Sequence, residues 1–343
     1  MQSFDLSGLS VTDDTLRACA WSPRSDRLAV CARDAVYVFS REAPSSPLRF
    51  EVVGATPRCA AFSTDGALLA VGTDAGASAV VVFDAATAAP RGSAKAYYAN
   101  TGDTVGRMVD MVTDVAFSPR GDALAVAGTG VRAVLRAADG WGGAMALHDA
   151  GATSHYYAET TSLALSPDGR AVLWSDESSF VRAATSALAG AAYPDDLFND
   201  RGTSDLSGPK ELGPLRPAGR ASISADGRRT TLAMWRAKDG RAALVRIVNK
   251  RVTGVVAQGD GASERLDAVH VDDQRGALWS TRKGALYRMN ADTGALSPVK
   301  PCKGLDARRT PVAVVVSADG GSVARVYRAA VVATRIVAKG HAP

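Results

Sequence analysis

Short apolar runs joined by a recurring tight turn dominate the pattern of hydrophobic and polar positions along the chain. The clearest example is residues 116–122 (AFSPRGD), which lead at once into the apolar run 124–126 (LAV). In such a turn a serine or aspartate oxygen caps the backbone, proline presets φ, and glycine supplies a positive φ. Apolar runs on both sides predict a β-hairpin, and no convincing helical stripe of useful length is present.

The same turn recurs along the whole chain. Its anchor residues, in order, are Ser22, Ser63, Ser118, Ser166, Ser224, Val271 in a degenerate unit, and Ser317. The mean separation is (317 − 22)/6, or about 49 residues, and propeller repeats run ~40–50 residues. A third apolar run usually follows each hairpin, and a weaker fourth is expected before the next anchor. The pattern therefore predicts an all-β chain: a seven-bladed β-propeller of four-stranded antiparallel blades, with residues 1–343 as one domain.

The chain ends predict how the ring closes. The last unit offers only three apolar runs before Pro343, whereas a spare apolar stretch lies near residues 3–6 (SFDL). We expect this N-terminal stretch to add the missing outer strand to the last blade, which would remove an exposed edge.

The anchors resemble those of the WD-repeat propeller family, and the resemblance covers essentially the full chain. The family's Trp-Asp position after the third strand reads Phe39-Ser40 in the first unit and Phe83-Asp84 in the second, and it is lost in the others. The single Gly-His pair is Gly340-His341, at the chain end. The resemblance thus indicates a divergent member, for which six or eight blades are the alternatives to seven.

Charge and composition narrow the function classes. The 40 basic and 35 acidic residues give a net charge of +5, spread without any run of five like charges, which does not favour a nucleic-acid partner. The N-terminus does not read as a signal peptide, and no apolar run approaches the ~18 residues of a membrane span. An intracellular, cytoplasmic protein is the expectation, with the nucleus as the alternative. The cysteines are expected to be buried thiols outside any metal motif: Cys19, Cys31, Cys59 and Cys302.

No catalytic constellation emerges from the residues. The chain lacks the GxSxG, HExxH, phosphate-loop and post-strand GxGxxG motifs, and its four histidines are scattered. The paired carboxylates Asp195-Asp196 and Asp272-Asp273 read as solvated turn residues. We therefore expect a protein that is not an enzyme and holds no metal or cofactor.

Two groups of residues are candidates for partner binding. Residues entering the innermost strands, four or five positions before an anchor, would lie on the rim of the central channel: Arg17, Arg58, Asp114, Arg220 and Asp267. Two long segments between anchors, 85–112 and 185–219, could carry recognition on a rigid scaffold. Their aromatic candidates are Tyr97, Tyr98, Tyr193 and Phe198. Solvated charges, or arginines paired with the aspartates, are the alternative for the rim, and tolerated insertions are the alternative for the segments.

These features favour a protein–protein interaction scaffold that acts as a subunit of a larger assembly, although a fold alone does not determine function. A phosphoinositide-binding propeller acting at membranes is one alternative. Relatives of that kind carry Phe-Arg-Arg-Gly, which residues 227–230 (GRRT) and 307–310 (ARRT) approach without matching. A metal-dependent lactonase-type propeller is another alternative. It would need acidic ligands at the channel, for which Asp114 and Asp267 are the candidates.

Overall fold

Strands make up nearly all the regular structure. The computed structural model describes residues 2–6, 9, 19–98, 102–106, 111–129, 131–147, 162–166, 168, 171–175, 180–184, 215–224, 228–236, 238–248, 251–258, 266–272, 276–281, 283–299, 311, 313–317, 321–327 and 330–335. Two short 3-10 helices, η1 (Gly76–Ser78) and η2 (Ala137–Asp139), accompany the strands. Within these residues, no helix has the length and apolar character to cross a bilayer.

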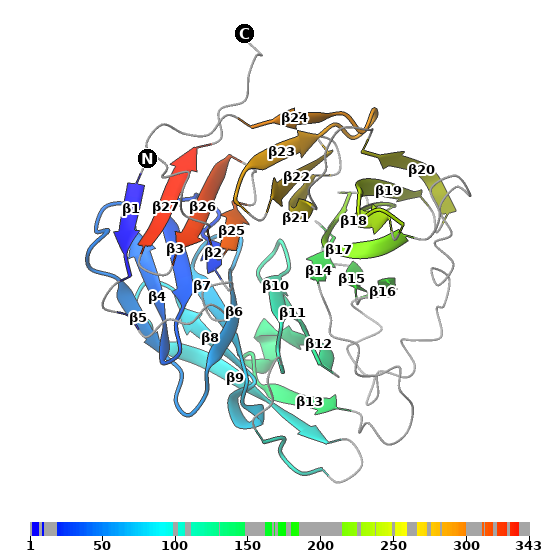
Figure 1. The fold of residues 1–343 in the computed structure, drawn as a ribbon. Coiled ribbons are helices and arrows are strands. Elements are labelled where there is room, and N and C mark those ends of the chain that lie inside the picture. Colours follow the sequence, from blue (N-terminus) through cyan, green and yellow to red (C-terminus); the bar gives the residue numbers. More distant parts are fainter. Residues whose placement is uncertain are drawn as a thin grey trace.

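The strands form seven sheets arranged around a centre, which we number in chain order (Figure 1). Sheet 1 holds β2 (Cys19–Trp21), β3 (Arg27–Cys31), β4 (Ala35–Ser40) and β5 (Leu48–Glu51). Sheet 2 holds β6 (Pro57–Phe62), β7 (Leu68–Thr73), β8 (Val80–Asp84), β9 (Pro90–Tyr98) and β13 (Gly143–Leu147). Sheet 3 holds β10 (Asp114–Phe117), β11 (Ala123–Gly128) and β12 (Val131–Arg136). Sheet 4 holds β14 (Ser162–Leu165), β15 (Ala171–Ser175) and β16 (Phe180–Ala184).

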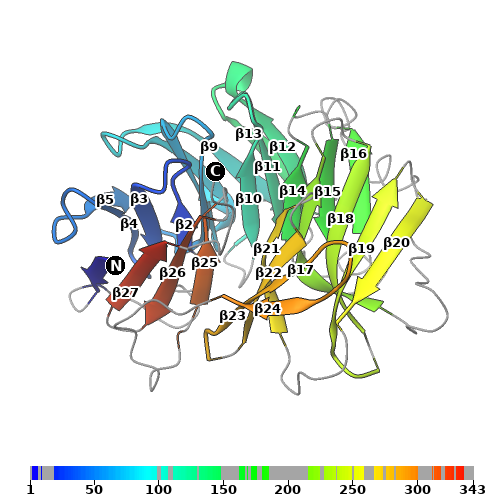
Figure 2. The same cartoon turned by 90° about the horizontal axis from the view of Figure 1, so that it is seen from above.

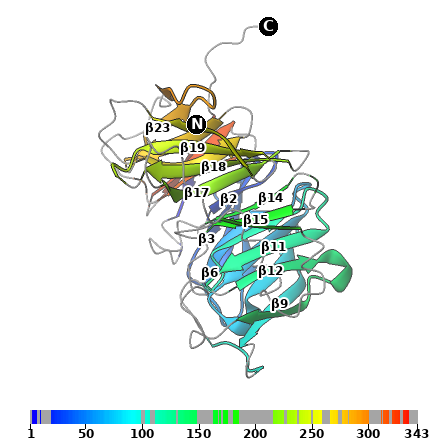
Figure 3. The ribbon, with the colours of Figure 1, turned by 90° about the vertical axis from the view of Figure 1, so that its right-hand side faces the viewer.

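The remaining three sheets complete the circuit. Sheet 5 holds β17 (Leu215–Ile223), β18 (Arg229–Arg236), β19 (Ala242–Val248) and β20 (Arg251–Ala257). Sheet 6 holds β21 (Leu266–Asp272), β22 (Gly276–Thr281), β23 (Leu286–Met289) and β24 (Leu296–Pro298). Sheet 7 holds β25 (Ala313–Val316), β26 (Ser322–Tyr327), β27 (Ala330–Arg335) and β1 (Gln2–Asp5). Figure 3 shows β17, β18 and β19 of sheet 5 side by side.

The sheets pack face to face around the centre. The first strand of each sheet contacts the first strand of the next, and β25 of sheet 7 contacts β2 of sheet 1. Seen from above, the successive sheets follow one another around the molecule in chain order (Figure 2). This arrangement is a β-propeller, in which radial repetition leaves only short edges exposed.

The expectation of a seven-bladed propeller with four antiparallel strands in each blade is wrong. Sheet 2 has five strands, and sheets 3 and 4 have three each in the described part of the chain. The strand that follows sheet 3, β13, runs parallel to β9 of sheet 2, with Gly143 opposite Ala94 and Leu147 opposite Tyr98. The physical reason is the turn after β12: η2 and Gly140 (φ 62°) carry the chain across to β9.

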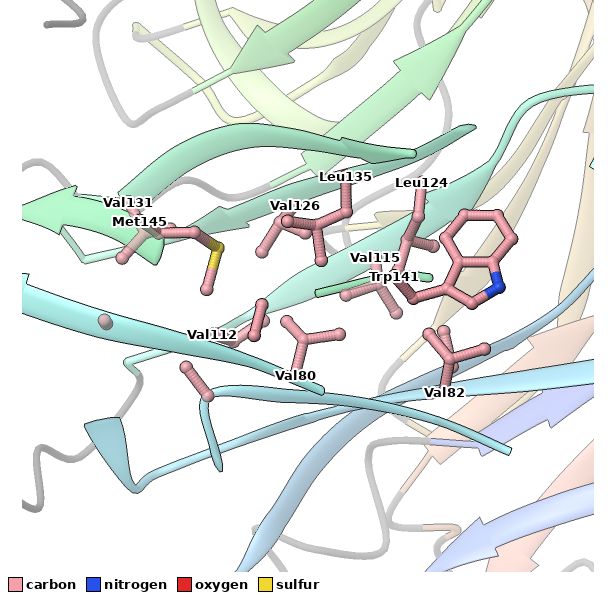
Figure 4. Close-up of a cluster of buried hydrophobic side chains, with 14 of the residues drawn as sticks. Val80, Val82, Val112, Val115, Leu124, Val126, Val131, Leu135, Trp141 and Met145 are labelled. Carbon is pink, nitrogen blue, oxygen red and sulfur yellow. The ribbon is translucent and has the colours of Figure 1, made fainter. Parts of the chain in front are cut away.

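A close approach between backbones makes this crossing feasible. A Cβ on Gly92 of β9 would lie 1.9 Å from the carbonyl oxygen of Gly140, so only glycine fits there. Trp141 then packs edge-on against Phe117, with ring centroids 5.5 Å apart. Figure 4 shows Trp141, Leu124 and Val82 within the buried cluster that joins sheets 2 and 3. Sheets 2 and 3 therefore share one continuous core.

The N-terminal strand closes the ring, as the sequence predicts. β1 pairs antiparallel with β27, with Phe4 opposite Val331. Phe4 is 1% exposed, and its ring centroid lies 5.2 Å from that of Phe39 in sheet 1. The two ends of the chain are thereby held together non-covalently, and the outer edge of sheet 7 is covered.

The recurring anchor turn has a hydrogen-bond explanation. In four turns the serine Oγ donates to an aspartate: Ser22 to Asp26, Ser63 to Asp65, Ser118 to Asp122 and Ser166 to Asp168. In five turns, those of Ser22, Ser63, Ser118, Ser224 and Ser317, the serine Oγ accepts from a backbone N–H five residues further on: Arg27, Leu68, Ala123, Arg229 and Ser322. One side chain thus satisfies the turn and the start of the second strand together.

A second repeated turn joins the third and fourth strands. In sheet 2 the Asp84 carboxylate accepts from the backbone N–H groups of Ala86 and Thr87. In sheet 6 the Asn290 side-chain oxygen accepts from those of Asp292 and Thr293 in the same way. Asp84 is the aspartate of the Trp-Asp position, and sheet 6 has Met289-Asn290 there, so the motif is lost in sheet 6 while the turn is kept. Asparagine retains the acceptor that the turn needs.

The described cysteines are packed into the sheets. Cys31 and Cys59 are buried, Cys19 is half-buried, and none of the three forms a disulfide within the described residues. Burial raises the pKa of the Cys19 thiol to about 12. It also raises the pKa values of Cys31 and Cys59. Thiols of this kind stay protonated at neutral pH and act as small apolar side chains. Cys302 lies outside the described residues.

Candidate interaction face

Strand direction divides the propeller into two faces. Each innermost strand ends at an anchor turn, so the anchor turns share one face, which we call the anchor face. The innermost strands begin on the opposite face, which we call the entry face. Loops between the second and third strands lie on the entry face as well, and their described residues are 32–34, 74–79, 238–241 and 283–285. Of the predicted rim residues, Arg58, Asp114 and Asp267 lie at or next to the start of their innermost strands, on the entry face.

Arg58 lies on β6 at the entry face, with 17% of its side chain exposed. Its guanidinium faces the carboxylate of Asp74 across 3.9 Å, and its buried Nε has no hydrogen-bond partner among the described residues. Asp74 is engaged elsewhere too, because its Oδ1 accepts from the backbone N–H of Thr56 at 2.7 Å. The alternative for the rim was that its arginines pair with its aspartates. Arg58 does pair with an aspartate, but this is Asp74, which was not among the rim candidates.

Asp114 links two neighbouring sheets. Its Oδ2 accepts a hydrogen bond of 3.1 Å from the backbone N–H of Leu163, at the start of β14. Burial is the larger cause of the raised pKa of Cys59, and the negative charge of Asp114 raises this pKa further. Asp114 and Arg58 therefore lie on adjacent innermost strands, and part of the Asp114 carboxylate serves the packing of sheet 4 against sheet 3.

The other rim candidates do not join them. Asp267 is exposed on β21, opposite Ser280, and sheets 4 and 5 separate it from Asp114. The backbone of Arg220 lies in β17 within the irregular stretch between Pro217 and Ala221, and its side chain is outside the described part of the structure. Arg17 lies outside the described residues. Of the described candidates, Arg58 and Asp114 are neighbours, whereas Asp267 lies apart from them.

Segment 85–112 is packed at several points, although more than half of its described residues are exposed. Tyr97 is half-buried on β9 and bridges to Thr104, so the segment folds back as a hairpin. Val105 and Met111 are buried. A Cβ on Gly76 would lie 2.1 Å from the carbonyl oxygen of Val105, and a Cβ on Gly128 would lie 1.7 Å from that of Met111. Gly76, in a loop of sheet 2, and Gly128, at the end of β11 in sheet 3, thus make room for this segment.

The other loop candidates are not tested in the same way. The backbone of Tyr98 pairs with Leu147 of β13, and its side chain is outside the described part of the structure. Tyr193 and Phe198, with most of segment 185–219, lie outside the described residues. Their role in docking stays a prediction.

Sequence reasoning missed a group of basic side chains on the entry face. Two neighbouring loops carry Arg236, Lys238 and Arg241 in sheet 5 and Lys283 in sheet 6, with Lys238 and Lys283 exposed. The available signal was the loop sequence 235–241 (WRAKDGR). It was overlooked because only residues entering innermost strands were counted, whereas loops between second and third strands reach the same face.

Among the described residues, no group of three or more His, Cys, Asp and Glu is arranged to hold a metal ion. What the entry face does present is fixed charges of both signs on short loops, an arrangement suited to contacting another macromolecule.

Comparison with known proteins agrees with the architecture. A chain in a crystal structure of the mitotic checkpoint complex matches with a TM-score of 0.61 and 12% sequence identity, over 98% of this chain and 91% of that chain. Because 1235 chains match, the likeness does not select one function. No family model matches the sequence, and no curated protein does. The ring of sheets and this likeness together show that the chain folds as a β-propeller.

Proposed function

We propose that this protein is a non-catalytic interaction scaffold, a divergent propeller of the WD-repeat type that holds partner proteins in a larger assembly through its entry face. The observation that carries the proposal is the entry face itself, where charged side chains stand on short loops that are fixed by hydrogen bonds. The Arg236 N–H, for example, donates to the carbonyl of Arg241 at 2.9 Å across the loop. Binding to such a surface requires little further ordering of the loop.

The structural likeness adds indirect support. The matching chain was crystallised as part of a multi-protein complex, and its propeller extends over nearly the same length. The WD-repeat assignment is further supported by the turn of Asp84 and its counterpart at Asn290, since aspartate at this position is typical of that family.

Capture of partners by the full-length tagged protein tests the proposal. The comparison uses wild type, an Arg58→Glu variant on the entry face, and an Arg120→Glu variant on the anchor face as the control. A stoichiometric partner that Arg58→Glu loses and Arg120→Glu retains would support an entry-face scaffold. Circular dichroism and thermal unfolding establish first that both variants fold. If no protein co-purifies with the wild type, or if partners are lost only by Arg120→Glu, the proposal fails.

A further inference from the structure

Two loops of the entry face, together with the rim candidate Asp267, form a charged surface. We call it the basic corner and define it as Arg236, Lys238, Asp239, Arg241, Asp267 and Lys283. Counting four basic and two acidic side chains, its net charge is 4 − 2, or +2. A local excess of this size is notable because the whole chain carries only +5.

The loop of sheet 5 holds its cations in place. Asp239 accepts from the Arg236 guanidinium through both carboxylate oxygens, and its Oδ2 lies 3.4 Å from Nε of Arg241. The hydrogen bond from Arg236 lowers the pKa of Asp239 to about 2, so this carboxylate stays ionised at neutral pH. Two guanidinium groups thus share one carboxylate, and exposed Lys238 adds a further positive charge.

The loop of sheet 6 is equally constrained. The Thr281 N–H donates to the carbonyl of Ala285 at 2.8 Å, and Gly284 turns the chain at φ 79°. The Gly284 carbonyl accepts from Nε of Arg325, which is 6% exposed, so the loop is fastened to sheet 7. Lys283 projects from this fixed loop and is exposed.

Contacts between sheets 5 and 6 place the two loops side by side. The Trp235 indole N–H donates to the carbonyl of Leu266 at 2.7 Å, and Leu266 lies opposite Thr281. Trp235 directly precedes the first loop, and Thr281 directly precedes the second. Asp267 follows Leu266 on β21 and lies opposite Ser280, so it stands next to this contact between the sheets.

We propose, on the basis of the proposed function, that the basic corner binds an acidic segment of a partner protein. The positive charges of the basic corner stand on separate side chains, and the corner also contains the negative charge of Asp267. A polypeptide can place carboxylates opposite the cations and a donor group opposite Asp267. A nucleic acid presents regularly spaced phosphates, which Asp267 would repel. Because the Arg236 guanidinium already pairs with Asp239, the contacts to the peptide come chiefly from the exposed Lys238 and Lys283.

The test measures binding of a fluorescein-labelled peptide of glutamate and glycine, with about ten carboxylates, by fluorescence anisotropy. Controls are the same peptide with glutamine for glutamate, and a single-stranded oligonucleotide of similar length. The test variant is Lys238→Glu/Lys283→Glu. The matched control is Arg24→Glu/Arg120→Glu, which makes the same change of charge at exposed sites on the anchor face.

We expect the full-length protein to bind the acidic peptide at low salt and to lose affinity as salt screens the contacts. The test variant should weaken binding by about fivefold or more, and the control variant by less than about twofold. Equal losses in both variants, unchanged binding in the test variant, or preference for the oligonucleotide would overturn the proposal.

The outcomes separate this inference from the scaffold proposal. A partner captured from lysate equally well by wild type and Lys238→Glu/Lys283→Glu would leave the scaffold standing and overturn a role for the basic corner. Specific peptide binding by a protein that captures no partner would support the basic corner and overturn the scaffold.

Discussion

Ser25 carries a backbone strain that its counterparts avoid. It occupies the left-handed region at φ 55°, where Gly66 (φ 73°) and Gly121 (φ 69°) stand in the matching turns. In all three turns this residue donates its N–H to the carbonyl of the anchor serine three positions earlier. The Ser25 hydroxyl is also buried without a hydrogen-bond partner among the described residues. The two matching turns thus show that glycine suits this position.

Ser25→Gly should therefore stabilise the protein. A non-glycine residue in this region costs about 1–2 kcal/mol, and glycine returns about 0.5–1 kcal/mol of that as greater freedom when unfolded. Loss of an unsatisfied hydroxyl adds to the gain. We expect the free energy of unfolding to rise by about 1 kcal/mol in urea titrations.

The reverse substitution is the control. Gly121→Ser should destabilise by a similar amount, since a Cβ there meets no atom within 4 Å and only the backbone strain would act. Gly66 is a poorer choice, because a Cβ there would lie 2.9 Å from the Arg27 guanidinium. A lower urea midpoint for Ser25→Gly would contradict the argument.

At the scale of elements, the short strand β1 contributes to the packing between sheets 7 and 1 that closes the ring. Phe4 and Leu6 are each 1% exposed and belong to a cluster that includes Trp21 and Phe39 of sheet 1 and Val331 of sheet 7. Trp21 adds a hydrogen bond from its indole N–H to the carbonyl of Val315, at 3.2 Å. Ring closure therefore rests on side chains from both ends of the chain.

Phe4→Ala should weaken this closure. Removing a buried phenylalanine costs about 3–5 kcal/mol, and we expect about 3 kcal/mol because β1 is an edge strand that can shift to fill the space. Urea unfolding measures the loss, and limited proteolysis should show earlier cleavage near the N-terminus. Val53→Ala, at a side chain 82% exposed, should change neither. An unchanged midpoint for Phe4→Ala would mean that β1 does not fasten the ring.

The elements show where sequence reasoning works. The anchor turns were predictable because each is encoded locally, by a serine, a turn residue and two flanking apolar runs. The pairing of β13 with β9 was not predictable, because it depends on contacts between residues far apart in sequence, such as Gly92 with Gly140. The basic corner was missed for a similar reason, since its two loops are linked through the contact of Trp235 with Leu266, which are 31 residues apart in sequence.

At the scale of the whole molecule, ionised aspartates fasten turns around the ring. Hydrogen bonding from Ser63 lowers the pKa of Asp65 on the anchor face of sheet 2. The Arg91 guanidinium and the backbone N–H of Ala86 hold the pKa of Asp84 far below its usual range. Asp239 in sheet 5 is lowered to a pKa of about 2, chiefly by Arg236. Two of these turns lie in sheet 2 and one lies in sheet 5, so acid acts on separate parts of the ring together.

Acid should therefore destabilise the propeller. A carboxyl group with a pKa lower in the folded than in the unfolded chain stabilises the fold above its unfolded pKa of ~4. That contribution is lost as the pH falls from about 5 towards 2. We expect the urea midpoint to be flat near neutral pH and to decline over this window.

Asp84→Asn isolates one contributor to this decline. Asn290 shows that an amide oxygen can accept the same backbone hydrogen bonds, so the turn should survive while the ion pair with Arg91 is lost. The variant should be less stable than wild type at pH 7, and its midpoint should fall less between pH 5 and 2. Parallel curves for variant and wild type would assign the acid sensitivity to other groups. Converging curves would show that the charge of Asp84, beyond its hydrogen bonds, helps to fasten sheet 2 within the ring.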